Sequence, residues 1–141
     1  MILSFTIPGP PVPLARARVV RNPRTGKIGG FTPDRSRAYE NLVRLIGQAA
    51  VAKLRGWPVD AEYRLTVRLW FGDYRRRDVS NCVKAVEDGL NSVAWVDDSQ
   101  IAWIDASRGY DARAPRAEVE IESLPVTARE IQKPKRARRV K

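Results

Sequence analysis

The stretch from Glu62 to Phe71 alternates apolar and polar side chains without a break, and it constrains the fold more than any other segment. One set of alternate positions is apolar, namely Tyr63, Leu65, Val67, Leu69 and Phe71. The positions between them hold Arg64, Thr66, Arg68 and Trp70. Successive side chains of a strand point to opposite faces, so this pattern predicts a long strand with one buried side. Such a strand belongs to a sheet that is covered on one face.

The other periodic segments complete a mixed architecture. Alternation over 2–7, 101–108 and 117–122 predicts three more strands. Apolar residues at three- and four-residue spacing predict helices over roughly 32–54 and 80–90. The first of these helices starts at Thr32-Pro33-Asp34, which offers a capping hydroxyl, a proline at the first helical position and an early acid. We therefore expect an α+β (mixed α/β) fold, a single domain in which two main helices pack on a mixed four-stranded sheet.

Composition limits the class of protein. A chain of 141 residues suits one domain, and a net charge of +10 favours anionic partners. A lone cysteine excludes an internal disulfide and fits a reducing compartment. The first residues lack the features of a signal peptide, and no run approaches eighteen apolar residues. We expect a cytoplasmic protein and no membrane contact.

Two basic segments flank the periodic core. Residues 14–30 carry five cations, Arg16, Arg18, Arg21, Arg24 and Lys27. They form either a mobile loop or an irregular hairpin, and they serve either as a solvated surface or as a clamp on a DNA backbone. Residues 133–141 hold six positive charges and no acid. We expect a folded domain over 1–124 and a basic, disordered tail over 125–141, which either tethers the protein to polyanions or only aids solubility.

The stretch from Arg75 to Gln100 holds the candidate chemistry. Three arginines precede Asp78, a short amphipathic helix follows, and the chain then reaches Asp97-Asp98. Because the chain has no histidine, carboxylates are the main candidates for holding a metal, and Mg²⁺ prefers oxygen ligands.

Helical spacing groups several polar side chains at the start of that helix, where free N–H groups favour anions. They are Asp78, Ser80, Asn81 and Lys84. The eight residues from 91 to 98 are long enough to return Asp98 to this end, although nothing in the sequence requires it.

Each of these residues also has a purely structural explanation. Asp78 is suited to cap the helix, and Asp97-Asp98-Ser99 has the composition of a turn. Lys84 has Glu87 and Asp88 as helical neighbours with which to pair. The three arginines could also serve only to blunt a sheet edge.

Taken together, the block RRRDVSNCVK over 75–84, Gly89-Leu90 and the segment WVDDSQ over 95–100 resemble the RusA family of Holliday-junction resolvases. That family has a basic run, an Asp-x-Asp-Asn-x-x-Lys motif, a helix and a Trp-x-Asp-Asp-x-Gln segment. The resemblance covers roughly residues 1–124. It implies a homodimeric endonuclease that uses Mg²⁺, or Mn²⁺ in its place, to nick four-way DNA junctions in recombination and repair.

The resemblance also implies roles for individual residues. Asp78 and Asp98 match catalytic, metal-binding aspartates, with Asp97 beside the latter, and Lys84 matches a functional lysine. Ser80 stands where the family has its second aspartate, so a weaker, neutral ligand replaces a carboxylate. The residues expected to contact DNA are Arg75, Arg76, Arg77, Arg16, Arg18 and Asn81.

Two other functions stay open at this stage. A basic module that binds structured DNA or RNA without cutting it explains the charge and the serine. A basic protein associated with ribosomes or chromatin explains the charge but leaves the two adjacent aspartates without a role.

Overall fold

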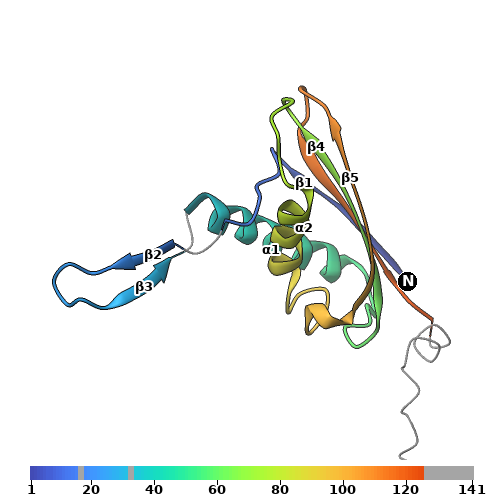
Figure 1. The fold of residues 1–141 in the computed structure, drawn as a ribbon. Coiled ribbons are helices and arrows are strands. Elements are labelled where there is room, and N and C mark those ends of the chain that lie inside the picture. Colours follow the sequence, from blue (N-terminus) through green and yellow to red (C-terminus); the bar gives the residue numbers. More distant parts are fainter. Residues whose placement is uncertain (16–17, 32–33, 126–141) are drawn as a thin grey trace, which may run out of the picture.

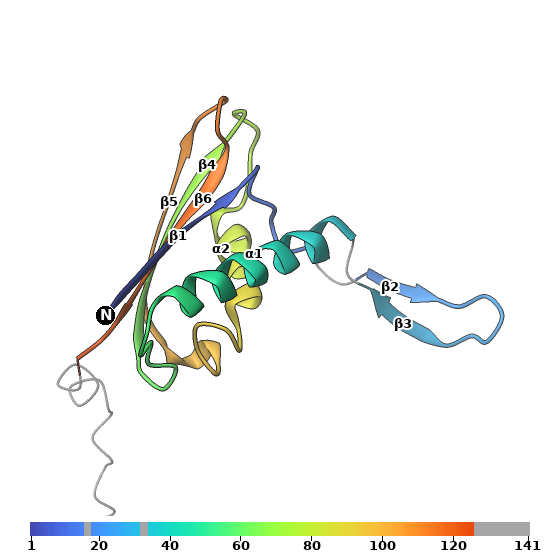
Figure 2. The ribbon, with the colours of Figure 1, turned by 180° about the vertical axis from the view of Figure 1, so that it is seen from behind.

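The computed structural model describes residues 1–15, 18–31 and 34–125. Two helices cover one face of a four-stranded sheet, and a two-stranded hairpin projects from the helical side, away from the sheet (Figures 1 and 2). The elements in chain order are β1 (Ile2–Pro8), β2 (Arg18–Arg21), β3 (Ile28–Phe31), α1 (Asp34–Lys53), β4 (Tyr63–Phe71), α2 (Val79–Leu90), the 3₁₀ helix η1 (Asp98–Gln100), β5 (Ile101–Tyr110) and β6 (Arg116–Ser123). The predicted α+β fold with a mixed four-stranded sheet is confirmed.

The strand order is β1-β6-β4-β5, with β4 parallel to β5 and antiparallel to β6. Parallel neighbours need a crossover connection, and α2 with its two loops provides it. Consequently the end of β4 leads directly into the N-terminus of α2, and the C-terminal end of α2 leads through η1 into β5. This β4–α2–β5 unit contains the whole candidate stretch from Arg75 to Gln100.

The predicted buried side of β4 is confirmed. Its alternate residues Tyr63, Leu65, Val67 and Leu69 have no exposed surface, and Phe71 is 4% exposed. The helices α1 and α2 pack on this side, and Cys82 of α2 is also fully buried. The helix contact includes two glycines, Gly47 and Gly89, which the apolar pattern did not reveal as part of the interface.

The basic segment 14–30 is partly a hairpin, in which β2 pairs antiparallel with β3 from Arg18↔Phe31 to Arg21↔Ile28. The amide N–H of Asn22 donates to the carbonyl of Lys27 at 2.8 Å, and Gly26 takes a φ of +67° that favours glycine. Of the two alternatives, hairpin and mobile loop, the structure shows the hairpin.

Some predicted features cannot be compared with the structure. Arg16, the helix cap at 32–33 and the tail from 126 lie outside the described residues, and the side chain of Arg18 is not described. Among the residues that are described, neither helix combines the length and apolar character needed to cross a bilayer.

Candidate functional site

The N-terminus of α2 is built by Asp78. Its carboxylate accepts a hydrogen bond from the amide N–H of Asn81 at 3.3 Å, so Asp78 is the N-cap of the helix. The amide groups of Val79 and Ser80 have no acceptor within the helix, because they belong to its first turn. The backbone N–H of Leu14 donates to the carbonyl of Asn81 at 3.0 Å, which ties the segment that precedes the basic hairpin to this end of α2.

Lys84, one turn further along α2, joins the helix to the η1 segment. Its ammonium group lies 3.0 Å from Oδ2 of Asp98, 3.3 Å from Oδ1 of Asp88 and 3.6 Å from Oε2 of Glu87. The hydrogen bond to Asp98 raises the pKa of Lys84 above its usual range. Lys84 therefore carries a positive charge at neutral pH, and it is suited to stabilise negative charge.

The η1 segment holds Asp98 in place through a capping box. The carboxylate of Asp97 accepts from the backbone and hydroxyl of Ser99, and the side chain of Gln100 accepts the N–H of Asp97 at 3.0 Å. Gln100 also donates to the carbonyls of Val59 and Ala61 at 3.0 and 2.9 Å, which anchors the segment to the body. The hydroxyl of Ser99 lowers the pKa of Asp97. Asp97 thus has the turn-forming role that the composition of the segment Asp97-Asp98-Ser99 suggested.

A divalent metal needs several oxygen ligands around one point. In the part of the chain that the structure describes, no three His, Cys, Asp or Glu side chains are grouped so that they could hold a metal ion. Asp98 is paired with Lys84, and Asp78 is bonded to a helix N–H. The carboxylates as arranged here therefore do not fit a ready-made metal site. The ligand set Asp78, Asp98, Asp97 and Ser80 stays a prediction.

Glu87 belongs to the same cluster although it is only 8% exposed. Burial raises its pKa, the carboxylates of Asp98 and Asp88 add to the increase, and Lys84 opposes it. A carboxyl group whose pKa is higher in the folded than in the unfolded chain stabilises the fold below its unfolded pKa, and this stabilisation is lost as pH rises through the folded pKa.

We expect Glu87→Gln to increase the free energy of unfolding at pH 7, because the buried charge is removed. The gain should shrink as the pH falls through the carboxyl range, where wild-type Glu87 is itself neutral. Urea unfolding at pH 7 and at pH 4 measures both values. Glu120→Gln, at an exposed position of β6, is the matched control and should change neither. A loss of stability in Glu87→Gln at pH 7 would mean that the attraction of Lys84 outweighs burial.

The loop between β4 and α2 gives its three arginines different environments. The guanidinium of Arg77 donates to Oδ1 of Asp73 at 2.6 Å and lies 4.7 Å from the centre of the Phe71 ring. This hydrogen bond lowers the pKa of Asp73 to about 2. Arg75 and Arg76 are exposed. Arg76 and Arg77 line a shallow hollow together with Asp78 and with Arg108 of β5. Arg77 is thus engaged within the loop, and Arg75 and Arg76 face solvent.

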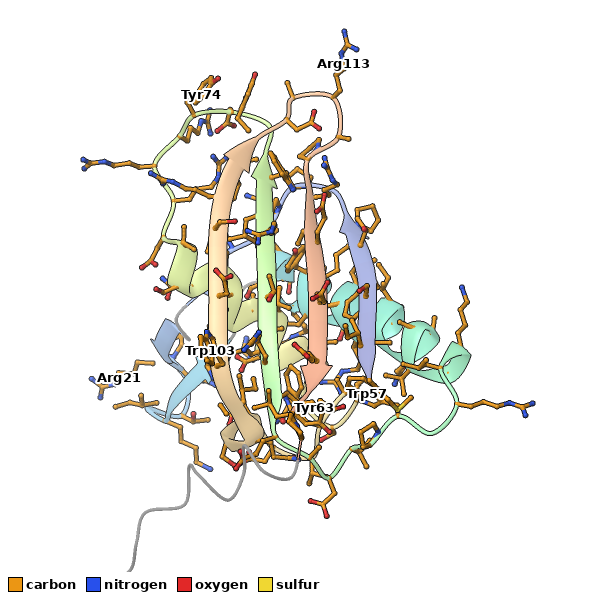
Figure 3. All side chains as sticks on the ribbon, turned by 90° about the vertical axis from the view of Figure 1, so that its right-hand side faces the viewer. Arg21, Trp57, Tyr63, Tyr74, Trp103 and Arg113 are labelled. Carbon is orange, nitrogen blue, oxygen red and sulfur yellow. The ribbon has the colours of Figure 1, made fainter. Side chains whose placement is uncertain are left out.

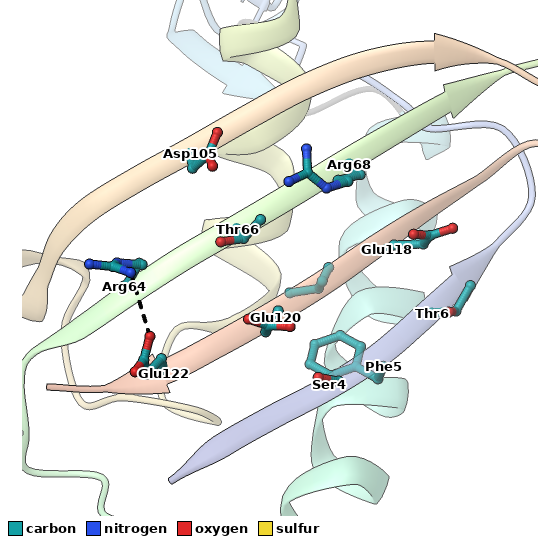
Figure 4. A pocket seen from close by; sticks show the side chains of 11 residues that line it. Ser4, Phe5, Thr6, Arg64, Thr66, Arg68, Asp105, Glu118, Glu120 and Glu122 are labelled. Carbon is teal, nitrogen blue, oxygen red and sulfur yellow. Dashed lines mark ion pairs between the residues drawn. The ribbon is translucent and has the colours of Figure 1, made fainter.

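The opposite face of the sheet carries a different charge pattern. Figure 3 shows this face uncovered, with Trp103 on the edge strand β5. A hollow on it is lined by Arg64 and Arg68 but also by four carboxylates, Asp105, Glu118, Glu120 and Glu122 (Figure 4). Arg64 and Glu122 pair at 3.7 Å. This face has more acidic than basic side chains, so it is unfavourable for a phosphate backbone. The region around the N-terminus of α2 is the better candidate for binding DNA.

The structure brings Lys84 and Asp98 together as the sequence allowed, and it adds residues that the sequence reasoning missed. Arg108, Tyr74 and Tyr110 gather beside the arginine loop. Tyr74 directly precedes Arg75, and an aromatic residue within a basic run was a signal that could have been used. Arg108 and Tyr110 could not have been found in this way, because only the pairing of β5 with β4 brings them there.

The comparisons with known proteins assign the chain to a family. The family model described as "Endodeoxyribonuclease RusA" matches residues 8–122, which include the basic hairpin, the arginine loop between β4 and α2, α2 itself and η1. A protein of Bacillus subtilis (strain 168), described as "Uncharacterized protein YqaN", is 28% identical over an alignment 140 residues long. The alignment covers 86% of this chain and 96% of that protein. A family match over most of the chain, with Asp78, Lys84 and Asp98 inside the matched region, shows that the protein belongs to the RusA family of endodeoxyribonucleases.

Proposed function

We propose that this protein is a structure-specific endonuclease that resolves four-way DNA junctions by paired, symmetric nicks. The observation that carries the proposal is the pairing of Lys84 with Asp98 at 3.0 Å, on the helix that Asp78 caps, in a chain of the RusA family. A lysine fixed as a cation beside a carboxylate, a helix N-terminus and exposed arginines is suited to phosphodiester chemistry.

In this proposal the residues of the chain divide the work. The ammonium group of Lys84 stabilises the charge that develops on the phosphoryl oxygens. Asp78 and Asp98 are the acidic catalytic residues. The free N–H groups at the start of α2 bind a phosphate oxygen and help to orient the strand that is cut.

We further propose that the enzyme depends on Mg²⁺, with Mn²⁺ as a substitute. Family membership supports a divalent cation. Such an ion would supply a bound water molecule of lowered pKa and would polarise the phosphate. Asp78 and Asp98 would be its ligands, with Asp97 and the hydroxyl of Ser80 nearby. Binding at Asp98 requires the ion to share that carboxylate with Lys84 or to displace Lys84 from it. Ser80 in place of a carboxylate weakens the site.

DNA contacts would come from the arginine loop before α2 and from the basic hairpin. Arg75 and Arg76 are exposed at the α2 end, and Asn81 is exposed on its first turn. The hairpin adds Arg21, Arg24 and Lys27, all exposed, and Leu14 in the segment before it is bonded to Asn81. A two-stranded ribbon has the dimensions to enter a major groove. We include Arg16 and Arg18 in this surface as proposed contacts.

We propose a homodimer, because a junction has approximate two-fold symmetry and two matched cuts need two sites. The apolar side chain of Ile104 on the edge strand β5, which is 49% exposed, offers surface for such an interface. The cellular role that follows is DNA recombination and repair in the cytoplasm, at the nucleoid.

The test is cleavage of a synthetic four-way junction. We expect the purified protein with Mg²⁺ to nick the junction at symmetric positions and largely to spare a linear duplex of the same sequence. The competing function is a basic module that binds structured DNA or RNA without cutting it, which Ser80 and the lack of a grouped metal site among the described residues favour. Binding without nicks in either Mg²⁺ or Mn²⁺ would select that function.

A further inference from the structure

The end of the sheet next to α2 carries an exposed pair of stacked aromatic rings. Tyr74 lies in the loop between β4 and α2, and Tyr110 is the last residue of β5. Their ring centres are 4.2 Å apart with an angle of 18° between the planes. Tyr74 is 84% exposed and Tyr110 is 42% exposed. Figure 3 shows Tyr74 beyond the end of the strands, away from the core.

The core does not explain this pair. A side chain that is 84% exposed contributes little burial, and most of the ring of Tyr74 faces water. Large exposed aromatic side chains are typical of binding surfaces. The stack offers one flat aromatic face at a fixed position, because pairing continues past β5, where the N–H of Asp111 donates to the carbonyl of Phe71 at 2.8 Å.

The surroundings of the stack are cationic. The two tyrosines line a hollow with Arg75, Arg76 and Arg108, and the only acid in its lining is Asp73. Arg77 neutralises Asp73 at 2.6 Å, so the three other guanidinium groups give the hollow its charge. A ligand that suits this hollow combines a flat ring with negative charge close to the ring.

We propose that Tyr74 and Tyr110 form a stacking site for a nucleobase that has left the base stack, with Arg75, Arg76 and Arg108 on the phosphates beside it. A base in a regular duplex hides its faces in the stack, so the site takes a base at a branch point or in a single strand.

The location links this site to the proposed nuclease. Tyr74 precedes Asp78 by four residues, which span at most about 14 Å. A base held on the tyrosines therefore places the following phosphates toward the N-terminus of α2. This link rests on the proposed function, whereas the stacking itself does not, because binding needs no cleavage.

Binding is measured in EDTA, with a fluorescein-labelled four-way junction and a linear duplex of equal length. We expect Tyr74→Ala to weaken junction binding by about tenfold to a hundredfold, since stacking of one base contributes on that scale. Duplex binding should change little. Tyr74→Phe and Tyr74→Trp, which keep a flat ring, should bind the junction as the wild type does. Trp103→Ala removes another exposed aromatic residue, on the open face, and is the matched control.

A second measurement separates stacking from a structural role of the loop. A junction with 5-iododeoxyuridine at the branch point should crosslink under ultraviolet light to Tyr74 or Tyr110, as identified by mass spectrometry. The same base placed within an arm should not. Crosslinking at neither tyrosine, together with equal junction affinities for Tyr74→Ala and Trp103→Ala, overturns the proposal. An equal loss of junction and duplex binding in Tyr74→Ala also overturns it, because it indicates backbone contacts alone.

These outcomes are independent of the nuclease. A protein that stacks the branch-point base but never nicks DNA keeps this inference and loses the proposed function. If the wild type nicks junctions, and Tyr74→Ala nicks them as fast and binds them as tightly, the proposed function stands and this inference fails.

Discussion

Replacing Asp98 by asparagine should lower the rate of junction cleavage by at least about a hundredfold, the scale on which loss of one preorganised catalytic group is measured. The substitution keeps the shape of the side chain and removes its charge, and with it the ion pair to Lys84 at 3.0 Å. Junction affinity in EDTA should stay within about twofold, because the phosphate contacts that we propose come from arginines at other positions. Single-turnover cleavage with Mg²⁺ measures the first value, and fluorescence anisotropy measures the second.

Asp105→Asn is the matched control for this change. Asp105 is exposed on the open face of the sheet, where carboxylates outnumber arginines. Its loss should affect neither cleavage nor binding. If Asp98→Asn cuts as fast as the wild type, Asp98 has no part in catalysis. If the wild type and Asp98→Asn are equally inert in Mg²⁺ and Mn²⁺, the protein is a binding module.

Replacing Gly89 by alanine should destabilise the protein by roughly 2 kcal/mol, within the range for overpacked interiors. A Cβ at this position would lie 2.7 Å from Cβ and Cγ1 of Val43 and 3.0 Å from the carbonyl oxygen of Glu40. Neither a β-branched side chain at its Cβ nor a backbone carbonyl can move aside, so α1 and α2 would have to separate. Alanine normally favours a helix over glycine by about 1 kcal/mol, so the expected sign is opposite to that of helix propensity.

Gly47→Ala provides the comparison within the same helix contact. A Cβ there would lie 2.5 Å from Cδ2 of Leu90, which is the end of a flexible side chain. We expect this variant to stay within about 1 kcal/mol of the wild type, because gained helix propensity offsets a small rearrangement. Urea denaturation compares the two free energies of unfolding. Equal effects of the two substitutions would contradict the close contact between Gly89 and Val43.

Basic and acidic side chains lie on different surfaces of this small domain. Charge is not spread evenly over the described residues. Arginines gather at the α2 end and on the hairpin, whereas Glu118, Glu120 and Glu122 follow one another along the open face of β6. An electrostatic field of this kind guides a polyanion to one end of the molecule.

Much of the local structure follows from the sequence alone. Alternation predicted the buried side of β4, and helical spacing predicted α1 and α2, because these periods reflect the geometry of each element by itself. Asp78 as helix cap and Lys84 with Glu87 and Asp88 as partners were also open to sequence reasoning, since they lie within one or two turns. The hairpin was not separable from a loop, because Gly29-Gly30 and scattered arginines carry no strand period.

The sequence by itself determined the order strand, helix, strand around the candidate stretch and placed one aspartate at the start of that helix. Only the tertiary structure decided that Asp98, fourteen residues away, meets Lys84, and that Tyr74 meets Tyr110. A return loop of eight residues can follow many paths of similar chain entropy. Buried Trp95 and the hydrogen bonds of Gln100 to Val59 and Ala61 select one of these paths, and such contacts exist only once the distant segments have packed.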